Sequence, residues 1–247
     1  MADTVMAVID CGATNVRVCA VDDTGAILHS ASRPNHPSPD TNPDFRIWDF
    51  DRIWNTLCTC CTEVAAAVGT ERIGGVISAT FGVDGGLIDE RGDLCAPVIS
   101  WTCDRTRPIM ETIDRYLPLE TLYEISALGP SAINTINKII WYKENMPDVL
   151  SRASSFLFFP TLCALRLGAP PVNDVSMAGT STLTDYRTRD WSESVFDALG
   201  IDRSLFDPLV EAGTVIGNVS ETAAQRTGLR PGTPIISAGH DTQCALY

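Results

Sequence analysis

The sequence has little positive charge and no long hydrophobic run. Its 247 residues include 18 lysines and arginines against 31 aspartates and glutamates, which gives a formal net charge of −13 at pH 7. So acidic a chain repels nucleic acid phosphates and anionic lipid, and we expect neither nucleic acid nor membrane as a partner. No apolar stretch approaches the ~20 residues that cross a bilayer. The most apolar short stretch, residues 156–167, is interrupted by Pro160 and Arg166.

The sequence also lacks the marks of a secreted or metal-bound protein. Its N-terminus has no basic start and no small-residue cleavage site, so we expect a cytoplasmic protein. The nine cysteines are odd in number and form no regular framework, which indicates free buried thiols. Cys58, Cys60 and Cys61 lie too close together for tetrahedral ligation, and no histidine is near them. The P-loop and Rossmann glycine patterns are absent as well.

Apolar runs predict the strands of an α/β domain. The composition is that of a globular protein, with 45% hydrophobic and 20% charged residues. Runs at residues 5–9, 16–21 and 26–32, with a turn at 22–25, predict a three-strand antiparallel meander. Residues 73–80 and 234–238 predict two further strands.

Apolar residues at helical spacing predict the helices that flank this sheet. The clearest helix is residues 49–68, with Asp49 or Asp51 at its start and Gly69 at its end. Further helices are predicted near residues 108–117, 134–145, 192–199 and 220–227, and residues 170–190 favour loop and short strands. The mixture predicts an α/β domain with a mixed sheet and a long insertion between its fourth and last core strands.

Acidic residues follow three of the predicted strands. After the first strand, Gly12 lets an anion approach backbone N–H groups, and the Thr14 hydroxyl adds a donor. Asp10 is placed to hold Mg²⁺ through water. The alternative is a tight hairpin with Asp10 in solvent.

The other two turns end the strands at residues 73–80 and 234–238. Asp241 follows the last strand directly and is placed to act as a general base, or alternatively as a helix N-cap. In the turn after the fourth strand, Asp84 is predicted to accept hydrogen bonds from a polyhydroxyl ligand, which the nearby glycines allow to approach the backbone.

Longer sequence motifs are spread over the whole chain, and three of them contain these acidic turns. They are DCGATNVR at 10–17, TFGVDGG at 80–86, PVISWTCDRT at 97–106, WYKENMP at 141–147, DVSMAGTS at 174–181, LVEAGTVIG at 209–217 and ISAGHDTQCAL at 236–246. Together they resemble the FGGY carbohydrate kinases. Within that family the strings are most similar to the L-fuculose kinases, and next to the L-rhamnulose kinases.

The resemblance implies the actin-like ATPase fold, in which ribonuclease-H-like domains flank a cleft, and a reaction between ATP and a ketose with Mg²⁺ present. Asp241 is then the base that accepts the proton of the attacking sugar hydroxyl, and Asp10 organises the Mg²⁺–phosphate end of ATP. The implied phosphate-facing residues are Gly12, Ala13, Thr14, Asn15 and Arg17. The implied sugar-pocket residues are Gly82, Asp84, Trp101, Asn134, His240 and Thr242.

Two further residues, Arg105 and Asp174, match family positions. For Arg105 a surface or supporting ion pair is the favoured interpretation, because such charges are common and energetically modest. Trp101 is at least as much a packing residue, because large aromatic side chains are usually mostly buried.

The resemblance also predicts how the chain is organised. We expect residues 1–247 to be the N-terminal, sugar-binding domain, without the C-terminal domain that binds the nucleotide. We therefore expect weak sugar binding, hardly any ATP binding and no turnover by this domain alone. L-rhamnulose, L-xylulose or another ketose stays an alternative to L-fuculose, and the oligomeric state, including a homo-oligomer, is left open.

Two other functions are weighed against a kinase. One is a non-catalytic sugar-binding module, which would need neither a base nor a carboxylate for Mg²⁺. The other is a glycosidase that pairs Asp10 or Asp84 with Asp241.

Overall fold

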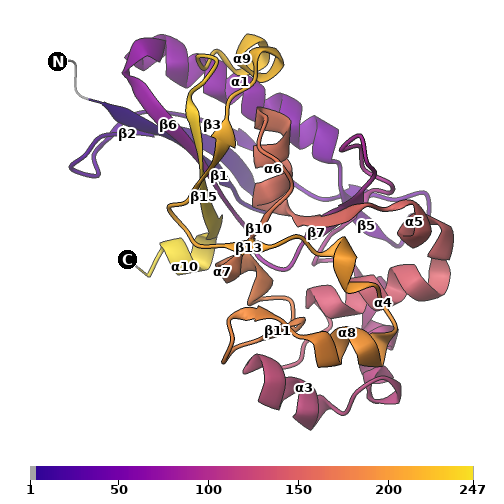
Figure 1. Ribbon diagram of the computed structural model, residues 1–247. Helices are drawn as coiled ribbons and strands as arrows, with labels where there is room; N and C mark the ends of the chain where they lie inside the picture. Colours follow the sequence, from indigo (N-terminus) through magenta and orange to yellow (C-terminus); the bar gives the residue numbers. More distant parts are fainter. Residues whose placement is uncertain (1–3, 247) are drawn as a thin grey trace.

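A six-stranded mixed sheet forms the upper part of the molecule (Figure 1). The structure, a computed structural model, describes residues 4–246. The strand order is β14-β15-β6-β1-β2-β3. β1, β6 and β15 run parallel, whereas β1–β2–β3 and β14–β15 are antiparallel pairings. The strands are β1 Val5–Cys11, β2 Asn15–Val21, β3 Ile27–Pro34, β6 Ile73–Thr80, β14 Val215–Asn218 and β15 Pro234–His240.

Alternating side chains explain the meander of β1, β2 and β3. In β1, Val5, Ala7 and Ile9 are buried and the residues between them are half-buried, so one face of the strand packs into the core. The turn between β2 and β3 is closed by Asp22, whose Oδ1 accepts hydrogen bonds from the backbone of Thr24 and Ala26 at 2.9 Å. The structure confirms the predicted three-strand meander.

Three helices cover one face of this sheet. α1 (Phe50–Val68) packs across β2 and β3, and α6 (Phe159–Leu167) across β6 and β15. α9 (Glu221–Thr227) lies beside α1 along the top of the molecule (Figure 1). Asp49 caps α1 through its Oδ1, which accepts from Arg52 N at 3.0 Å, so the predicted start of this helix is confirmed.

Apart from α6, most of the residues between β6 and β14 form the lower part of the molecule (Figure 1). Their own core contains a group of packed aromatic rings, Phe156, Phe158, Trp191, Phe196 and Phe206. The helices here are α2 Arg107–Glu111, α3 Leu119–Ser126, α4 Thr135–Asn145, α5 Pro147–Arg152, α7 Val175–Ala178 and α8 Glu193–Leu199. The strands are β7 Gly85–Ile88, β8 Val98–Ile99, β9 Ser155–Phe158, β10 Asn173–Asp174, β11 Thr184–Asp185, β12 Asp190–Trp191 and β13 Leu209–Val210.

Short segments complete the chain. β4 Ser38–Pro39 and β5 Arg46–Trp48 join β8 in a small sheet, and α10 Asp241–Cys244 follows β15. Single 3₁₀ turns occur at Thr70–Arg72, Asp104–Thr106, Ile113–Arg115 and Arg203–Leu205. No helix within residues 4–246 is long and apolar enough to span a membrane.

Some predicted elements differ from the structure. The single helix predicted at residues 108–117 is two short turns, α2 and Ile113–Arg115, separated at Thr112, whose hydroxyl bonds back to Pro108 O at 3.0 Å. α6 has no counterpart among the predicted elements. Pro160 interrupts the apolar run at residues 156–167, but it occupies the first turn of this helix, where proline is tolerated.

Candidate active site

The three acidic turns of the sequence meet at one edge of the sheet. β1, β6 and β15 are parallel neighbours, so their carboxyl ends lie side by side. Thr80, the last residue of β6, is paired with Cys11 on one side and His240 on the other. The turn after each strand therefore opens onto the same region of the surface.

The hairpin between β1 and β2 carries the first acidic group. Arg17 lies opposite Asp10 and donates two hydrogen bonds to its Oδ2, from Nη2 at 2.7 Å and from Nε at 3.2 Å. Asp10 Oδ1 has no hydrogen-bond partner within residues 4–246. The structure brings all of the predicted phosphate-facing residues into one open pocket, lined by Asp10, Gly12, Ala13, Thr14, Asn15 and Arg17 together with Ser32.

The end of β15 carries the second acidic group. The pairing of β15 with β6 shifts register between Ser237 and Gly239, and Gly239 has a φ of +91° that favours glycine. Asp241 is the first residue of α10, and the N-cap position belongs to His240 instead. The Oδ1 atom of Asp241 accepts from Thr242 N at 2.6 Å and lies 3.4 Å from His240 Nε2.

The His240 ring is half-buried between these turns. Its Nδ1 is buried and has no hydrogen-bond partner within the described part of the chain. Burial lowers the pKa of His240, and the carboxylates of Asp241 and Asp174 oppose that shift. A buried ring nitrogen without a hydrogen-bond partner is unusual in a folded protein.

Two neighbouring pockets share Asp241 and Thr242. The first is lined by Asp10, Arg17 and Ala79 on the sheet and by Cys244 on α10. The second has a volume of about 580 Å³ and holds most of the residues predicted to bind sugar. It is lined by Phe81, Gly82, Val83, Trp101, Asn134, Thr180, His240, Asp241 and Thr242, among others. Asp241 therefore lies between the Asp10 hairpin and the second pocket, which we call the sugar pocket after the residues predicted from the sequence to bind sugar.

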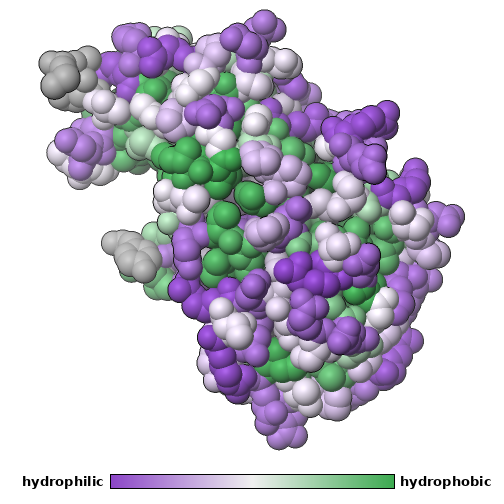
Figure 2. Space-filling view, in the orientation of Figure 1, coloured by the Kyte–Doolittle hydropathy of each residue, from purple (hydrophilic) through white to green (hydrophobic). Residues whose placement is uncertain are grey.

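Apolar side chains interrupt the polar surface near this edge. In the view of Figure 2, hydrophobic atoms gather over the strands in the middle of the molecule, between two largely hydrophilic ends. The sugar pocket itself combines the apolar side chains of Phe81, Leu128 and Ile133 with the imidazole of His240. Such a lining suits a small ligand that has both hydroxyl groups and an apolar part.

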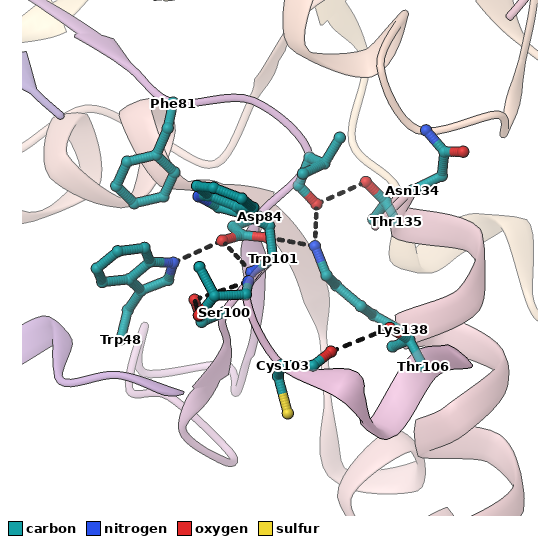
Figure 3. A network of polar contacts seen from close by, with 12 residues as sticks. Trp48, Phe81, Asp84, Ser100, Trp101, Cys103, Thr106, Asn134, Thr135 and Lys138 are labelled. Carbon is teal, nitrogen blue, oxygen red and sulfur yellow. Dashed lines mark hydrogen bonds and ion pairs between the residues drawn. The ribbon is translucent and has the colours of Figure 1, made fainter. Parts of the chain in front are cut away.

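The structure corrects the prediction that Asp84 accepts hydrogen bonds from a polyhydroxyl ligand. Its carboxylate is fully buried, does not line the sugar pocket and bonds only to protein groups (Figure 3). Oδ2 accepts from Trp48 Nε1 at 2.5 Å and from Trp101 N at 2.9 Å, and Oδ1 pairs with Lys138 Nζ. Its position in the glycine-rich turn suggests exposure, but the side chain is fully buried and both of its carboxylate oxygens are bonded to protein donors.

Trp101 and Asn134 lie in the pocket wall for different reasons. The Trp101 side chain is 37% exposed, so it is not the buried packing residue of the alternative interpretation. Asn134 is buried, and its amide is already bonded to Ser131 N at 2.7 Å and to Thr180 O at 3.1 Å. Asn134 therefore shapes the wall through the backbone that it ties together.

Arg105 lies away from both pockets. Its guanidinium pairs with Asp40 at 2.7 Å and lies against the rings of Phe45 and Trp141, 4.2 Å and 4.8 Å from their centroids. Ion pairing was predicted for this residue, but the pair is buried and not on the surface, with only 4% of the Arg105 side chain exposed.

Asp174 supports the end of β15. Its Oδ1 accepts from the Ser176 and Met177 backbone at 2.7 Å and 3.2 Å, and its Oδ2 accepts from Ser237 Oγ at 3.2 Å. Ser176 Oγ in turn donates to Asp174 and accepts from His240 N at 3.0 Å. A Cβ atom at Gly239 would lie 2.0 Å from Asp174 Oδ1, so this clamp fits glycine closely.

Several residues at the site were not predicted from the sequence. Lys138 is the main one, a lysine that is 1% exposed in α4 between the buried Ile136 and Ile139. A lysine inside an apolar helical stripe was the signal that indicated a buried partner. Phe81, which follows β6 directly, and Thr180 also line the pocket.

The donor groups at the site favour a hard cation and not a soft one. All nine cysteines are free, as predicted, but Cys95 and Cys244 are not fully buried. Within residues 4–246 no group of three or more His, Cys, Asp or Glu side chains is arranged to hold a metal ion by itself. The carboxylate of Asp10, with Oδ1 free, fits a Mg²⁺ ion that takes its other ligands from phosphate and water.

Comparison with known proteins agrees with this arrangement. Residues 5–247 match the model of the FGGY family of carbohydrate kinases, N-terminal domain. The chain is 43% identical over its whole length to L-fuculokinase of Escherichia coli (strain K12), of which it covers 52%. It is 36% identical to L-fuculokinase of Haemophilus influenzae, with 97% of this chain and 52% of that protein covered. The chain thus spans about half the length of the curated relatives that it matches.

Solved structures show the same fold. The crystal structure of xylulose kinase from Rhodospirillum rubrum superposes with a TM-score of 0.87 at 20% identity, over 96% of this chain and 49% of that one. The mixed sheet with helices over it is therefore the actin-like ATPase fold that the sequence predicted. With the family model matched along nearly all of its length, the chain belongs to the FGGY family of carbohydrate kinases.

Proposed function

We propose that the chain is the sugar-binding half of an ATP-dependent ketose kinase. The observation that carries this proposal is the position of Asp241, which lines both the sugar pocket and the pocket that contains Asp10 and Arg17. Phosphoryl transfer requires mainly positioning, charge neutralisation and a base near the attacking hydroxyl. The L-fuculokinase relatives support a sugar kinase, and half-length coverage supports a second, nucleotide-binding domain in the complete enzyme.

In the proposed reaction, Asp241 accepts the proton of a sugar hydroxyl while its oxygen attacks the γ-phosphorus and ADP leaves. The carboxylate of Asp241 is 38% exposed and free to accept at Oδ2. Arg17 and the backbone around Gly12 would face the phosphates, and Asp10 would be the residue that holds Mg²⁺, with water completing its ligands. The bound Mg²⁺ would supply positive charge to the phosphate oxygens.

L-fuculose is the favoured ketose. It is a 6-deoxy sugar with one apolar methyl group, and the pocket offers Phe81, Leu128 and Ile133 beside polar groups such as His240. L-rhamnulose, also a 6-deoxy sugar, is the alternative. Calorimetry with L-fuculose, L-rhamnulose and L-xylulose distinguishes them, and tightest binding of L-xylulose would contradict the preference for a deoxy sugar.

The test of the catalytic role is Asp241→Asn in the full-length enzyme. We expect kcat to fall by ~10²–10⁴-fold, the usual contribution of a general base, with sugar affinity kept. Asp104→Asn, on an exposed side chain that lines neither pocket, is the matched control and should leave kcat unchanged. Wild-type turnover by Asp241→Asn would contradict the proposal. Residues 1–247 alone should show no turnover, and normal activity of that fragment would contradict the two-domain arrangement.

A further inference from the structure

We propose, on the basis of the function proposed above, that the buried pair of Asp84 and Lys138 positions both walls of the sugar pocket and thereby sets sugar affinity. Neither side chain lines the pocket. They lie directly beneath it and contact the backbone of the two segments that do line it (Figure 3).

The first wall contains a residue in a strained conformation. Val83 has a φ of +63°, which a β-branched residue adopts only where its surroundings hold it there. Its carbonyl oxygen accepts from Lys138 Nζ and from Thr135 Oγ1, each at 2.8 Å. Its N–H donates to Thr180 Oγ1 at 3.1 Å. Lys138 therefore helps to hold the turn that presents Phe81 and Gly82 to the pocket.

The second wall is held by the other member of the pair. Asp84 Oδ2 accepts from the backbone N–H of Trp101 at 2.9 Å, which fixes the point where the Trp101 side chain enters the pocket. The same oxygen accepts from Trp48 Nε1 at 2.5 Å. Because Asp84 Oδ1 pairs with Lys138, the two walls are joined through one ion pair.

A contribution to folding stability does not by itself explain why Asp84 and Lys138 form a buried ion pair. The Asp84 side chain is fully buried and 2% of the Lys138 side chain is exposed, so both have lost their hydration. Burial raises the pKa of Asp84 and lowers the pKa of Lys138, and in both cases desolvation outweighs the attraction between them. Well-packed apolar side chains often replace such a pair without loss of stability. Apolar side chains cannot, however, bond the Val83 carbonyl or the Trp101 N–H.

The test separates folding from positioning. The single variants Asp84→Leu and Lys138→Met each leave one buried charge and should lower the Tm. The double variant Asp84→Leu/Lys138→Met should recover most of that Tm, because no unpaired charge remains. Its Kd for L-fuculose, measured by calorimetry, should still be raised by about tenfold or more, since small displacements of binding groups are costly. A double variant with the wild-type Kd would overturn the inference.

A buried pair away from the pocket provides the matched control. Asp40→Leu/Arg105→Met removes the pair of Asp40 and Arg105, which lines neither pocket. It should leave the Kd for L-fuculose unchanged. If the apolar variant at positions 84 and 138 fails to fold, Asp84→Asn/Lys138→Gln replaces it. Glutamine is shorter than lysine and does not reach Val83 O, so the Kd of this variant for L-fuculose should also rise. An unchanged Kd would overturn the inference.

A second readout needs no ligand. In a crystal structure of the double variant, Val83 should leave the left-handed region and the backbone at Trp101 should move. Unchanged geometry at both residues would overturn the inference. If the wild-type protein binds none of the ketoses, the proposed function fails, and this structural readout still decides whether the pair positions the two segments.

Discussion

The imidazole of His240 lies directly against Gly82. A Cβ atom at Gly82 would stand 2.7 Å from His240 Nε2 and 3.0 Å from its Cδ2, closer than real contacts allow. The contact joins the turn after β6 to the end of β15, and it places the only half-buried histidine of the described residues in the sugar pocket. The absence of a side chain at Gly82 is therefore what sets the position of this ring.

Gly82→Ala should weaken sugar binding. The new methyl group forces the His240 ring to move, and overpacking of this kind costs about 1–3 kcal/mol. The Kd for L-fuculose measured by calorimetry should rise. Gly179→Ala is the control, because a Cβ atom there meets only ordinary contacts, the nearest being Val175 O at 3.4 Å. Equal affinities for the Gly82→Ala variant and the wild type would show that His240 does not face the ligand.

Asp10→Asn should abolish turnover of the full-length enzyme and hardly change its stability. The Asp10–Arg17 pair is exposed, with 35% and 48% of the two side chains accessible, and such pairs contribute only about 0–1 kcal/mol. Initial rates over a range of Mg²⁺ concentrations measure the first effect, and chemical denaturation the second. Glu63→Gln breaks the similarly exposed pair with Arg33 and should leave the rates unchanged. Full activity of Asp10→Asn would exclude a role in Mg²⁺ binding.

Ser176→Ala should lower kcat more than it changes KM. The substitution removes the acceptor of His240 N, and the loss of one such hydrogen bond destabilises by about 1 kcal/mol. The greater effect is expected on turnover, because the freed segment carries Asp241. Ser155→Ala removes the hydroxyl of a more deeply buried serine, bonded to Asp207 away from the site, and should affect stability alone. Parallel losses of stability in both variants with unchanged kcat would contradict the positioning role.

Stability should depend on pH through His240. Burial lowers its pKa below the ordinary 6.5, so the folded protein binds fewer protons there than the unfolded chain does. The free energy of unfolding should therefore fall as the pH drops from about 6.5 through the lowered pKa of the folded state. His240→Gln should remove this part of the pH dependence, whereas His36→Gln, on an exposed side chain, should keep it. Denaturation curves between pH 5 and 8 measure the difference, and identical pH profiles for the wild type and His240→Gln would contradict the assignment.

The sequence patterns that correctly predicted parts of the fold are those that depend on neighbouring residues. The β1–β3 meander and α1 follow from side-chain alternation and from the Asp49 cap, which neighbouring residues determine. The convergence of Asp10 and Asp241 followed from strand ends and from family resemblance. The burial of Asp84 has no local signal, since its turn is compatible with exposure, whereas the apolar residues around Lys138 indicate its burial but not the identity of its partner. No local pattern shows that two residues more than fifty positions apart neutralise each other.

The position of β15 between β14 and β6 has a consequence for how the site is assembled. β6 ends at Thr80 and its partner His240 comes 160 residues later, so this parallel pairing closes a very long loop of chain. Contacts so distant in sequence form slowly, because the entropy of loop closure opposes them. During folding, the meander and α1 can form early from nearby residues, whereas Asp241 reaches the pocket only when β15 inserts. We therefore expect the site to be the last part of the domain to form.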